Sequence, residues 1–244
     1  MNEVIVSMNN ISKSFPGVKA LDHVKFELRS GEVMALLGEN GAGKSTLMKI
    51  LAGAYIKDEG EIYIDGNPAD ITCPEDSERL GVAIIYQEFN LVPGLTVAEN
   101  IFMRRQPKKN GMIDWKRMNQ MAQAIIDEID INIRPTDIVN TLTVAEQQMV
   151  EICKAVSLNS KILIMDEPTR GIDVGAKYEI YCIINDLVAA GKSVIMISSE
   201  LPEVLGMSDR IYIMNEGKFV GEVSKEEATS ELIMSKIVKS GKGA

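Results

Sequence analysis

The sequence is organised around one glycine-rich stretch, Gly38-Glu39-Asn40-Gly41-Ala42-Gly43-Lys44-Ser45-Thr46, which fits the pattern G-x-x-x-x-G-K-[ST]. The apolar run Val33–Leu37 precedes it, and Leu47–Ala52 follows with the composition of a helix. A buried strand, a glycine loop and a helix start therefore fall in order. The glycines let the backbone turn tightly, so that N–H groups and a helix N-terminus point at one phosphate chain. This order predicts an α/β core with a phosphate-binding loop.

Two side chains of the loop have expected roles in this chemistry. Lys44 would reach the two terminal phosphates of a nucleotide. Ser45 would place its hydroxyl on Mg²⁺, which bridges those phosphates and neutralises the charge of the leaving phosphoryl group.

Composition limits the other classes of function. The 244 residues are 45% hydrophobic, enough for one large core with a smaller lobe. The net charge of −9 argues against broad attraction to nucleic acid or anionic lipid, although local basic patches stay possible. Three cysteines without C-x-x-C spacing and a single histidine indicate a reducing compartment and argue against zinc. No apolar run reaches the length of a membrane span, so a membrane role would need a partner.

Short strands are predicted near the N-terminus, at Val4–Met8, Val24–Leu28 and Glu61–Ile64, the last before the hairpin turn Asp65-Gly66. They suggest an antiparallel lobe beside the phosphate loop. Phe15 lies in a Pro/Gly loop, where its ring could stack on a base or simply cover a sheet edge.

Polar side chains follow three further apolar runs. Val82–Tyr86 ends at Gln87, which could hold a water or complete the shell of Mg²⁺. Lys161–Met165 ends at Asp166 and Glu167, to which we assign Mg²⁺ coordination through water and orientation of the attacking water. The run 193–197 ends at Ser198, Ser199 and Glu200.

From Thr96 to about Ser157 the pattern is helical. Apolar residues at helical spacing follow the cap Asp114, namely Met118, Met121, Ala122, Ile125, Ile126 and Ile129, and we interpret these methionines and Trp115 as helix packing. Arg104–Gly111 is interpreted as a solvated loop, with lipid headgroups or an acidic partner as the alternative. Thr143–Glu146 and Ser224–Glu227 have the form of capping boxes that open helices, and Asp173 is expected to cap another helix.

The ordered set of phosphate loop, Gln87, helical insert, Asp166-Glu167-Pro168-Thr169 and Asp173 resembles the ATP-binding subunit of ABC transporters over nearly the whole chain. The resemblance implies one domain over residues 1–244. Its RecA-like P-loop NTPase core would carry an antiparallel β lobe (about 1–30 and 61–72) and a helical insert (about 96–157).

Within that family the chain is similar to the sugar-import type, in which one polypeptide carries two fused nucleotide-binding halves. Phe15–Leu21, Gly38–Ala52 and Gln147–Ile152 resemble the first half, whereas Thr169–Lys177 and Ser198–Leu205 resemble the second. We therefore expect an in-frame join near Asp166–Thr169, which uniform similarity to one half would contradict.

Two departures from the family pattern follow. The family sandwiches ATP against a Leu-Ser-Gly-Gly-Gln signature of a facing domain, and the matching stretch here is Leu142-Thr143-Val144-Ala145-Glu146. The glycines allow close backbone approach to the terminal phosphate, whereas Val144 and Ala145 add side chains and Glu146 adds a negative charge. The switch histidine of the family aligns with Ser199, which donates a hydrogen bond without a positive charge. Low intrinsic ATPase activity is expected.

By resemblance, the chain would bind ATP and Mg²⁺ and pair with a second ABC domain, in which Asp173 belongs to the dimer loop. It would work with membrane-spanning permease subunits at the cytoplasmic face of the cell membrane, as a peripheral protein importing a monosaccharide. The alternative is a dimerising or regulatory module with little ATP turnover. The net negative charge argues against an ABC protein that acts on DNA or ribosomes, so no nucleic-acid partner is expected.

Overall fold

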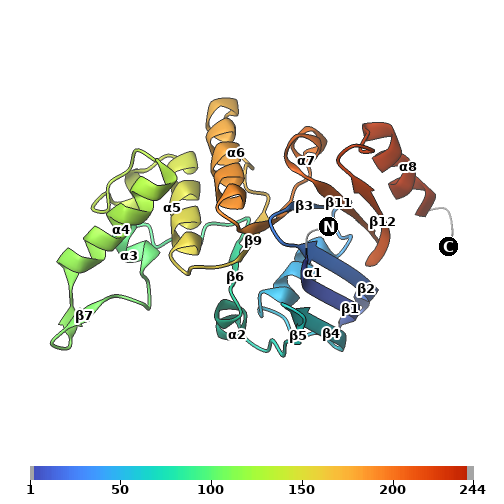
Figure 1. The fold of residues 1–244 in the computed structure, drawn as a ribbon, viewed down its shortest axis with the longest axis horizontal. Coiled ribbons are helices and arrows are strands. Elements are labelled where there is room, and N and C mark those ends of the chain that lie inside the picture. The colour runs from blue at the N-terminus through green and yellow to red at the C-terminus, as the bar shows by residue number, and fades with distance from the viewer. Residues whose placement is uncertain (1–2, 241–244) are drawn as a thin grey trace.

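A computed structural model describes residues 3–240 (Figure 1). The centre is a six-stranded sheet in the order β12-β11-β3-β10-β9-β6. Its strands are β3 (Val33–Leu37), β6 (Val82–Ile85), β9 (Ile162–Asp166), β10 (Ser193–Ile197), β11 (Arg210–Asn215) and β12 (Lys218–Ser224). Only β12 runs antiparallel to its neighbour. Strands β3, β9 and β10 are buried on both faces, which accounts for their continuous apolar sequences.

Alternate residues of these strands enter two separate cores, as the two-residue period of a strand requires. Met34 and Leu36 face the first core, with α1 (Lys44–Leu51) and the antiparallel lobe. Val33, Ala35 and Leu37 face the second core. There the sheet packs against α5 (Val144–Val156), α6 (Val174–Ala189), α7 (Leu201–Met207) and α8 (Ser230–Ser240). The phosphate loop therefore follows a strand, β3, that is packed on both faces.

The antiparallel lobe has the order β2-β1-β4-β5. It comprises β1 (Val4–Phe15), β2 (Val18–Arg29), β4 (Glu59–Ile64) and β5 (Asn67–Pro68). The first two strands extend well beyond the predicted Val4–Met8 and Val24–Leu28. Shifts of register between Met8 and Ile11 carry the pairing past Asn10, whose φ is 54°, so the polar pair at 9 and 10 does not end the strand.

Ahead of α5, the predicted insert (about 96–157) comprises two helices, a hairpin and a short 3₁₀ turn, which lie to the left in Figure 1. In chain order these are α3 (Val97–Ile101), β7 (Lys108–Lys109), β8 (Met112–Ile113), α4 (Trp115–Ile129) and η1 (Val139–Thr141). Met118, Ala122 and Ile126 are buried as predicted. The prediction is wrong for Trp115 and Met121, which are 53% and 39% exposed, because the apolar stripe of α4 is wider than the surface that α3 and α5 cover.

The capping boxes divide into one confirmed and one wrong prediction. Thr143 caps α5 together with Glu146, and Asp114 and Asp173 cap α4 and α6. Ser224 instead ends β12, where it pairs with Arg210, and a turn follows. Helix α8 begins only at Ser230, after the Thr229 hydroxyl accepts the N–H of Leu232.

Another short helix, α2 (Pro74–Arg79), lies before β6. Within residues 3–240 we find no helix long and apolar enough to cross a bilayer.

Candidate functional site

The glycine loop connects the end of β3 to the start of α1. Gly41 and Gly43 have φ of 85° and 96°, in the left-handed region that favours glycine. A Cβ at Gly43 would lie 2.6 Å from the carbonyl oxygen of Ala20. Gly43 is also the N-cap of α1, so no side chain caps the helix there. The N–H groups of the first turn thus suit an anionic group such as a phosphate.

Lys44 folds back across this loop. Its Nζ donates to the carbonyl oxygens of Gly38 and Glu39 at 2.8 and 3.0 Å. Burial lowers the pKa of the amine, and the nearby carboxylates of Glu167 and Asp166 oppose that effect. The lysine therefore lies between the loop and the carboxylates that end β9.

Asp166 lies beside Ser45. Burial raises the pKa of the Asp166 carboxyl, whereas a hydrogen bond from Ser45 and the charges of Lys49 and Lys44 act in the opposite direction. Ser45, Asp166 and Gln87 together line one hollow of about 580 Å³. Hydroxyl, carboxylate and amide oxygens are the hard donors that Mg²⁺ takes, so this donor set fits that ion.

Glu167 and Ser199, which follow two of the apolar runs, also lie together. The Ser199 hydroxyl donates to Oε2 of Glu167 at 3.1 Å. Strands β9 and β10 are parallel neighbours, so the residues after them emerge at one edge of the sheet. Glu167 itself has φ of 52°, and its N–H donates to the carbonyl oxygen of Ile197 at 2.9 Å, which fixes its backbone against the neighbouring strand.

Sequence reasoning missed Glu203 on α7, which holds this edge together. Its buried carboxylate accepts from the Thr169 hydroxyl at 2.8 Å and from the Ser198 hydroxyl. Thr169 and Ser198 lie next to the segments that carry Glu167 and Ser199, so Glu203 joins them. The available signal was a single carboxylate inside the otherwise apolar stretch 201–205.

The segment after Gln87 is fastened to α5, a second feature that the sequence did not indicate. The N–H of Asn90 donates to Oε1 of Glu151 at 2.6 Å, and the Lys154 ammonium donates to the Asn90 carbonyl oxygen at 2.9 Å. Glu151 is buried and lies 3.6 Å from Lys154. We call Asn90, Glu151 and Lys154 the Asn90 clamp.

The stretch Leu142–Glu146 lies elsewhere. Glu146 accepts from the Thr143 N–H at 2.8 Å and from its hydroxyl at 2.9 Å, and thereby completes the cap of α5. Thr143, Val144, Ala145 and Glu146 line a separate hollow that also includes Asp173. Asp173 caps α6 through the N–H groups of Gly175 and Ala176 at 3.0 and 3.1 Å. In a single chain, therefore, this stretch and the Ser45 hollow are distinct.

Phe15 is 37% exposed at the end of β1. Its ring packs edge-to-face on Tyr55, with 5.3 Å between the ring centroids. It does not line the hollow of Ser45 and Asp166. The contact with Tyr55 favours the interpretation in which the Phe15 ring covers the edge of the lobe. Part of the ring is exposed, so stacking on a base stays a prediction.

Comparisons with known proteins give one consistent result. A family model described as ABC transporter matches residues 21–170. The chain is 46% identical over 231 residues to a putative ribose/galactose/methyl galactoside import ATP-binding protein of Albidiferax ferrireducens, covering 94% of this chain and 46% of the relative. It is 47% identical over 229 residues to a ribose import ATP-binding protein of Streptomyces coelicolor, covering 94% of this chain and 44% of the relative.

Solved structures agree in fold. A nucleotide-free ATP-binding cassette from an ABC transporter superposes with a TM-score of 0.86 at 26% identity, covering 99% of this chain and 100% of that one. The ADP conformation of such a cassette gives a TM-score of 0.86 at 27% identity, with the same coverage. The chain spans about half the length of the curated relatives it matches. The in-frame join near 166–169 stays a prediction.

Proposed function

Because this chain belongs to the ABC transporter family, we propose that it binds and hydrolyses ATP to power a membrane transporter whose cargo is a monosaccharide. Cassettes of this family bind ATP or ADP with Mg²⁺. The observation that carries the proposal is the meeting of Lys44, Ser45, Asp166 and Glu167 at one edge of the parallel sheet. The proposal of a monosaccharide cargo rests on the names of relatives, of which this chain spans about half the length.

The residues at this edge divide the work of phosphoryl transfer. Gly38–Thr46 would hold the phosphates through backbone N–H groups, with Lys44 as the point charge. Ser45, Gln87 and Asp166 would hold Mg²⁺, which neutralises charge on the terminal phosphates. Glu167 would orient the attacking water, and the Ser199 hydroxyl would keep that carboxylate in place.

The stretch Leu142–Glu146 and Asp173 would contact the phosphate site of a second ABC domain, since neither lines the hollow of Ser45 within this chain. We propose membrane-spanning permease subunits as the further partner and a peripheral position at the cytoplasmic face of the membrane. The alternative of a regulatory module without transport draws no support from relatives named as import proteins.

The site assignment is tested by titration calorimetry with Mg-ATP. Lys44→Ala should weaken affinity by about 10- to 100-fold, because a charge-assisted hydrogen bond contributes about 1.5–3 kcal/mol. The matched control is Lys25→Ala, an exposed lysine on β2. Equal affinity in both variants would remove Lys44 from the site. Copurification of a membrane-spanning partner, and phosphate release with it, tests the transport function separately.

A further inference from the structure

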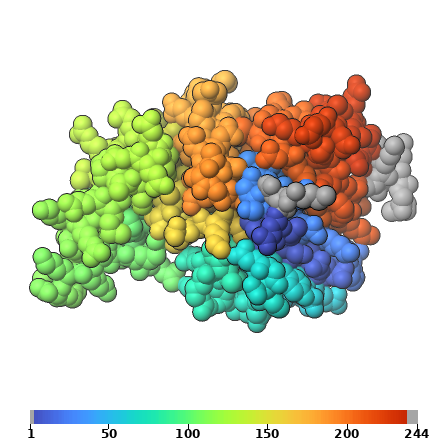
Figure 2. Space-filling view, viewed as in Figure 1, coloured from blue at the N-terminus to red at the C-terminus, as the bar shows by residue number. Residues whose placement is uncertain are grey.

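The outer end of the insert is a small hairpin that leads directly into α4. We call residues 108–117 the insert tip. Lys108 pairs with Ile113 and Lys109 with Met112, across a turn in which Asn110 and Gly111 have φ of 51° and 83°. These angles are typical of the tight turn that Asn-Gly favours. Figure 2 shows this part of the chain standing out from the body of the molecule at lower left.

The insert tip exposes large apolar side chains. Met112 is 73% exposed, Trp115 is 53% exposed and Ile113 is 37% exposed. None of the three belongs to the core of the insert. Trp115 is the only tryptophan of the chain. Tryptophan combines a large apolar ring with an N–H donor, a combination suited to the boundary between water and an apolar phase.

The cations of the insert tip are unpaired. Lys108, Lys109, Lys116 and Arg117 are all exposed, and within residues 3–240 none of them forms a salt bridge. The single carboxylate of the tip, Asp114, accepts the N–H of Arg117 at 3.0 Å as a helix cap. The upstream arginines are occupied, Arg104 by Glu75 and Arg105 by backbone oxygens of Ile101 and Ser157.

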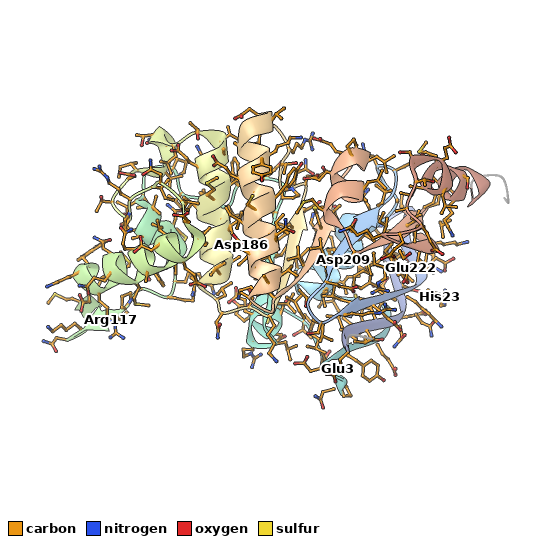
Figure 3. The ribbon with its side chains drawn as sticks, turned by 45° about the horizontal axis from the view of Figure 1, so that its top comes forward. Glu3, His23, Arg117, Asp186, Asp209 and Glu222 are labelled. Carbon is orange, nitrogen blue, oxygen red and sulfur yellow. The ribbon has the colours of Figure 1, made fainter. Side chains whose placement is uncertain are left out.

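This positive charge is segregated within a chain whose net charge is −9. Figure 3 shows Arg117 at the far end of the insert, at the opposite end of the molecule from His23 and Glu222. Salt screens charge over about 8–10 Å, so a protruding tip can meet an anionic surface while the acidic body stays away from it. An extended nucleic acid would also run along the acidic body.

We propose that the insert tip binds the headgroup region of an anionic lipid bilayer, with the four cations on the headgroups and Trp115 and Met112 at the acyl boundary. Paired basic and aromatic side chains fit such an interface, whereas an acidic protein segment would match the cations and leave the apolar side chains exposed. The inference rests on the tip itself and holds whether or not the chain drives a transporter.

The first measurement uses the fluorescence of Trp115 in the full chain without any permease. Phosphatidylcholine vesicles containing phosphatidylglycerol should shift its emission to the blue, and brominated acyl chains should quench it. Pure phosphatidylcholine vesicles should do neither, and high salt should reverse the binding. Because the chain has one tryptophan, the signal reports the tip alone.

The second measurement compares two variants of equal net charge by co-sedimentation with the phosphatidylglycerol vesicles. The tip variant carries Lys108→Gln, Lys109→Gln, Lys116→Gln and Arg117→Gln, and should lose more than about 100-fold in affinity, at about fivefold per cation. The control carries Lys25→Gln, Lys161→Gln, Lys218→Gln and Lys225→Gln, all exposed elsewhere, and should bind like the parent. Met112→Ser, which changes no charge, should weaken binding several-fold.

Three results would overturn the inference. One is the absence of a Trp115 shift with phosphatidylglycerol vesicles. Another is an equal loss of affinity in the tip variant and the control. The third is tighter binding to poly-glutamate than to the vesicles, which would assign the tip to an acidic protein. Thermal unfolding of both variants checks that each is folded.

Discussion

At the scale of single residues, Asp166 is a carboxyl group whose environment disfavours its ionised form. Burial raises the pKa of its carboxyl, and only in part do Ser45, Lys49 and Lys44 compensate. An acid whose pKa is higher in the folded state costs stability when ionised. That cost is absent below the ordinary pKa, grows as the pH rises through the raised value and is complete above it.

We therefore expect Asp166→Asn to stabilise the nucleotide-free chain, and by more at pH 8 than at pH 4, which is close to the ordinary pKa of an aspartate. A gain of about 1 kcal/mol would raise the thermal midpoint by about 2–4 °C in a chain of this size. Mg-ATP should stabilise the variant less than the parent, because the proposed metal donor has lost its charge. Thermal unfolding at both pH values, with and without Mg-ATP, measures this.

Asp70→Asn is the control, since Asp70 is an exposed aspartate on the lobe side of the chain. It should show neither effect. A variant Asp166→Asn that is destabilised at pH 8, or that gains fully from Mg-ATP, would contradict the argument.

The residues that end parallel strands were the most predictable part of the site. Asp166, Glu167 and Ser199 follow apolar runs, and the ends of parallel strands meet at one edge of the sheet. Glu203 could not be found in this way. Its partners Thr169 and Ser198 come from two other segments, and no sequence period links them to α7.

At the scale of elements, α5 connects three parts of the molecule. It begins at the Thr143–Glu146 cap, and Glu151 in its middle and Lys154 in its last turn hold Asn90. Met149 and Ile152 face the sheet, whereas Val150 and Cys153 face α3 and α4. Burial raises the pKa of the Cys153 thiol to about 12, so this thiol is inert packing at neutral pH.

The Asn90 clamp should hold the segment after Gln87 even in the isolated chain. Glu151→Ala removes the charged acceptor of the Asn90 N–H, so we expect exchange of that amide to speed up by about 10- to 100-fold. Hydrogen exchange over residues 88–93 measures this. Glu128→Ala on α4 removes an exposed glutamate without contact to that segment, and should leave the rates unchanged. Equal exchange in both variants would mean that the clamp does not hold the segment.

The elements that the sequence misjudged share one cause. Helical spacing identified α4, but it could not tell which apolar side chains α3 and α5 would cover, so Trp115 and Met121 were assigned to packing. Likewise, Ser224 has the local pattern of a helix cap, yet pairing with Arg210 keeps it in a strand. A local sequence pattern reflects only residue types, whereas the burial of Trp115 and Met121 and the secondary structure of Ser224 depend on neighbours distant in sequence.

At the scale of the whole molecule, the fold was predictable because strands, loop and helices follow one another in an order specific to a family. The extent of the lobe strands was not, since it depends on irregular pairing around Asn10. A contact between Leu142–Glu146 and a phosphate loop could not be predicted from one chain either, because within this chain the two line separate hollows.

A homodimer of this chain should hydrolyse ATP slowly. Phosphoryl transfer depends on donors preorganised around the terminal phosphate. Val144 and Ala145 would be presented there instead of glycines, Glu146 would add a negative charge, and Ser199 offers a neutral donor. The missing stabilisation corresponds to roughly two to three powers of ten in rate.

Restoring both features should raise single-turnover phosphate release by about 100- to 1000-fold. The variant carries Ser199→His, Val144→Gly, Ala145→Gly and Glu146→Gln. Glutamine at 146 can still complete the cap with Thr143, so the charge is removed without losing the helix start. Glu167→Gln in the parent should abolish the residual rate. Brisk turnover by the unmodified homodimer would contradict this prediction.

One consequence of α5 concerns thermodynamic reciprocity. The helix is 13 residues long, about 20 Å, and is fixed to the Asn90 segment at its middle and to the Leu142–Glu146 stretch at its start. Because α5 moves as a rigid body, a change in its position moves the Asn90 segment and the Leu142–Glu146 stretch together. If a protein bound at the Asn90 segment changes, through the position of α5, the affinity for a molecule at the Thr143 end by some factor, that molecule must change the affinity for the protein by the same factor.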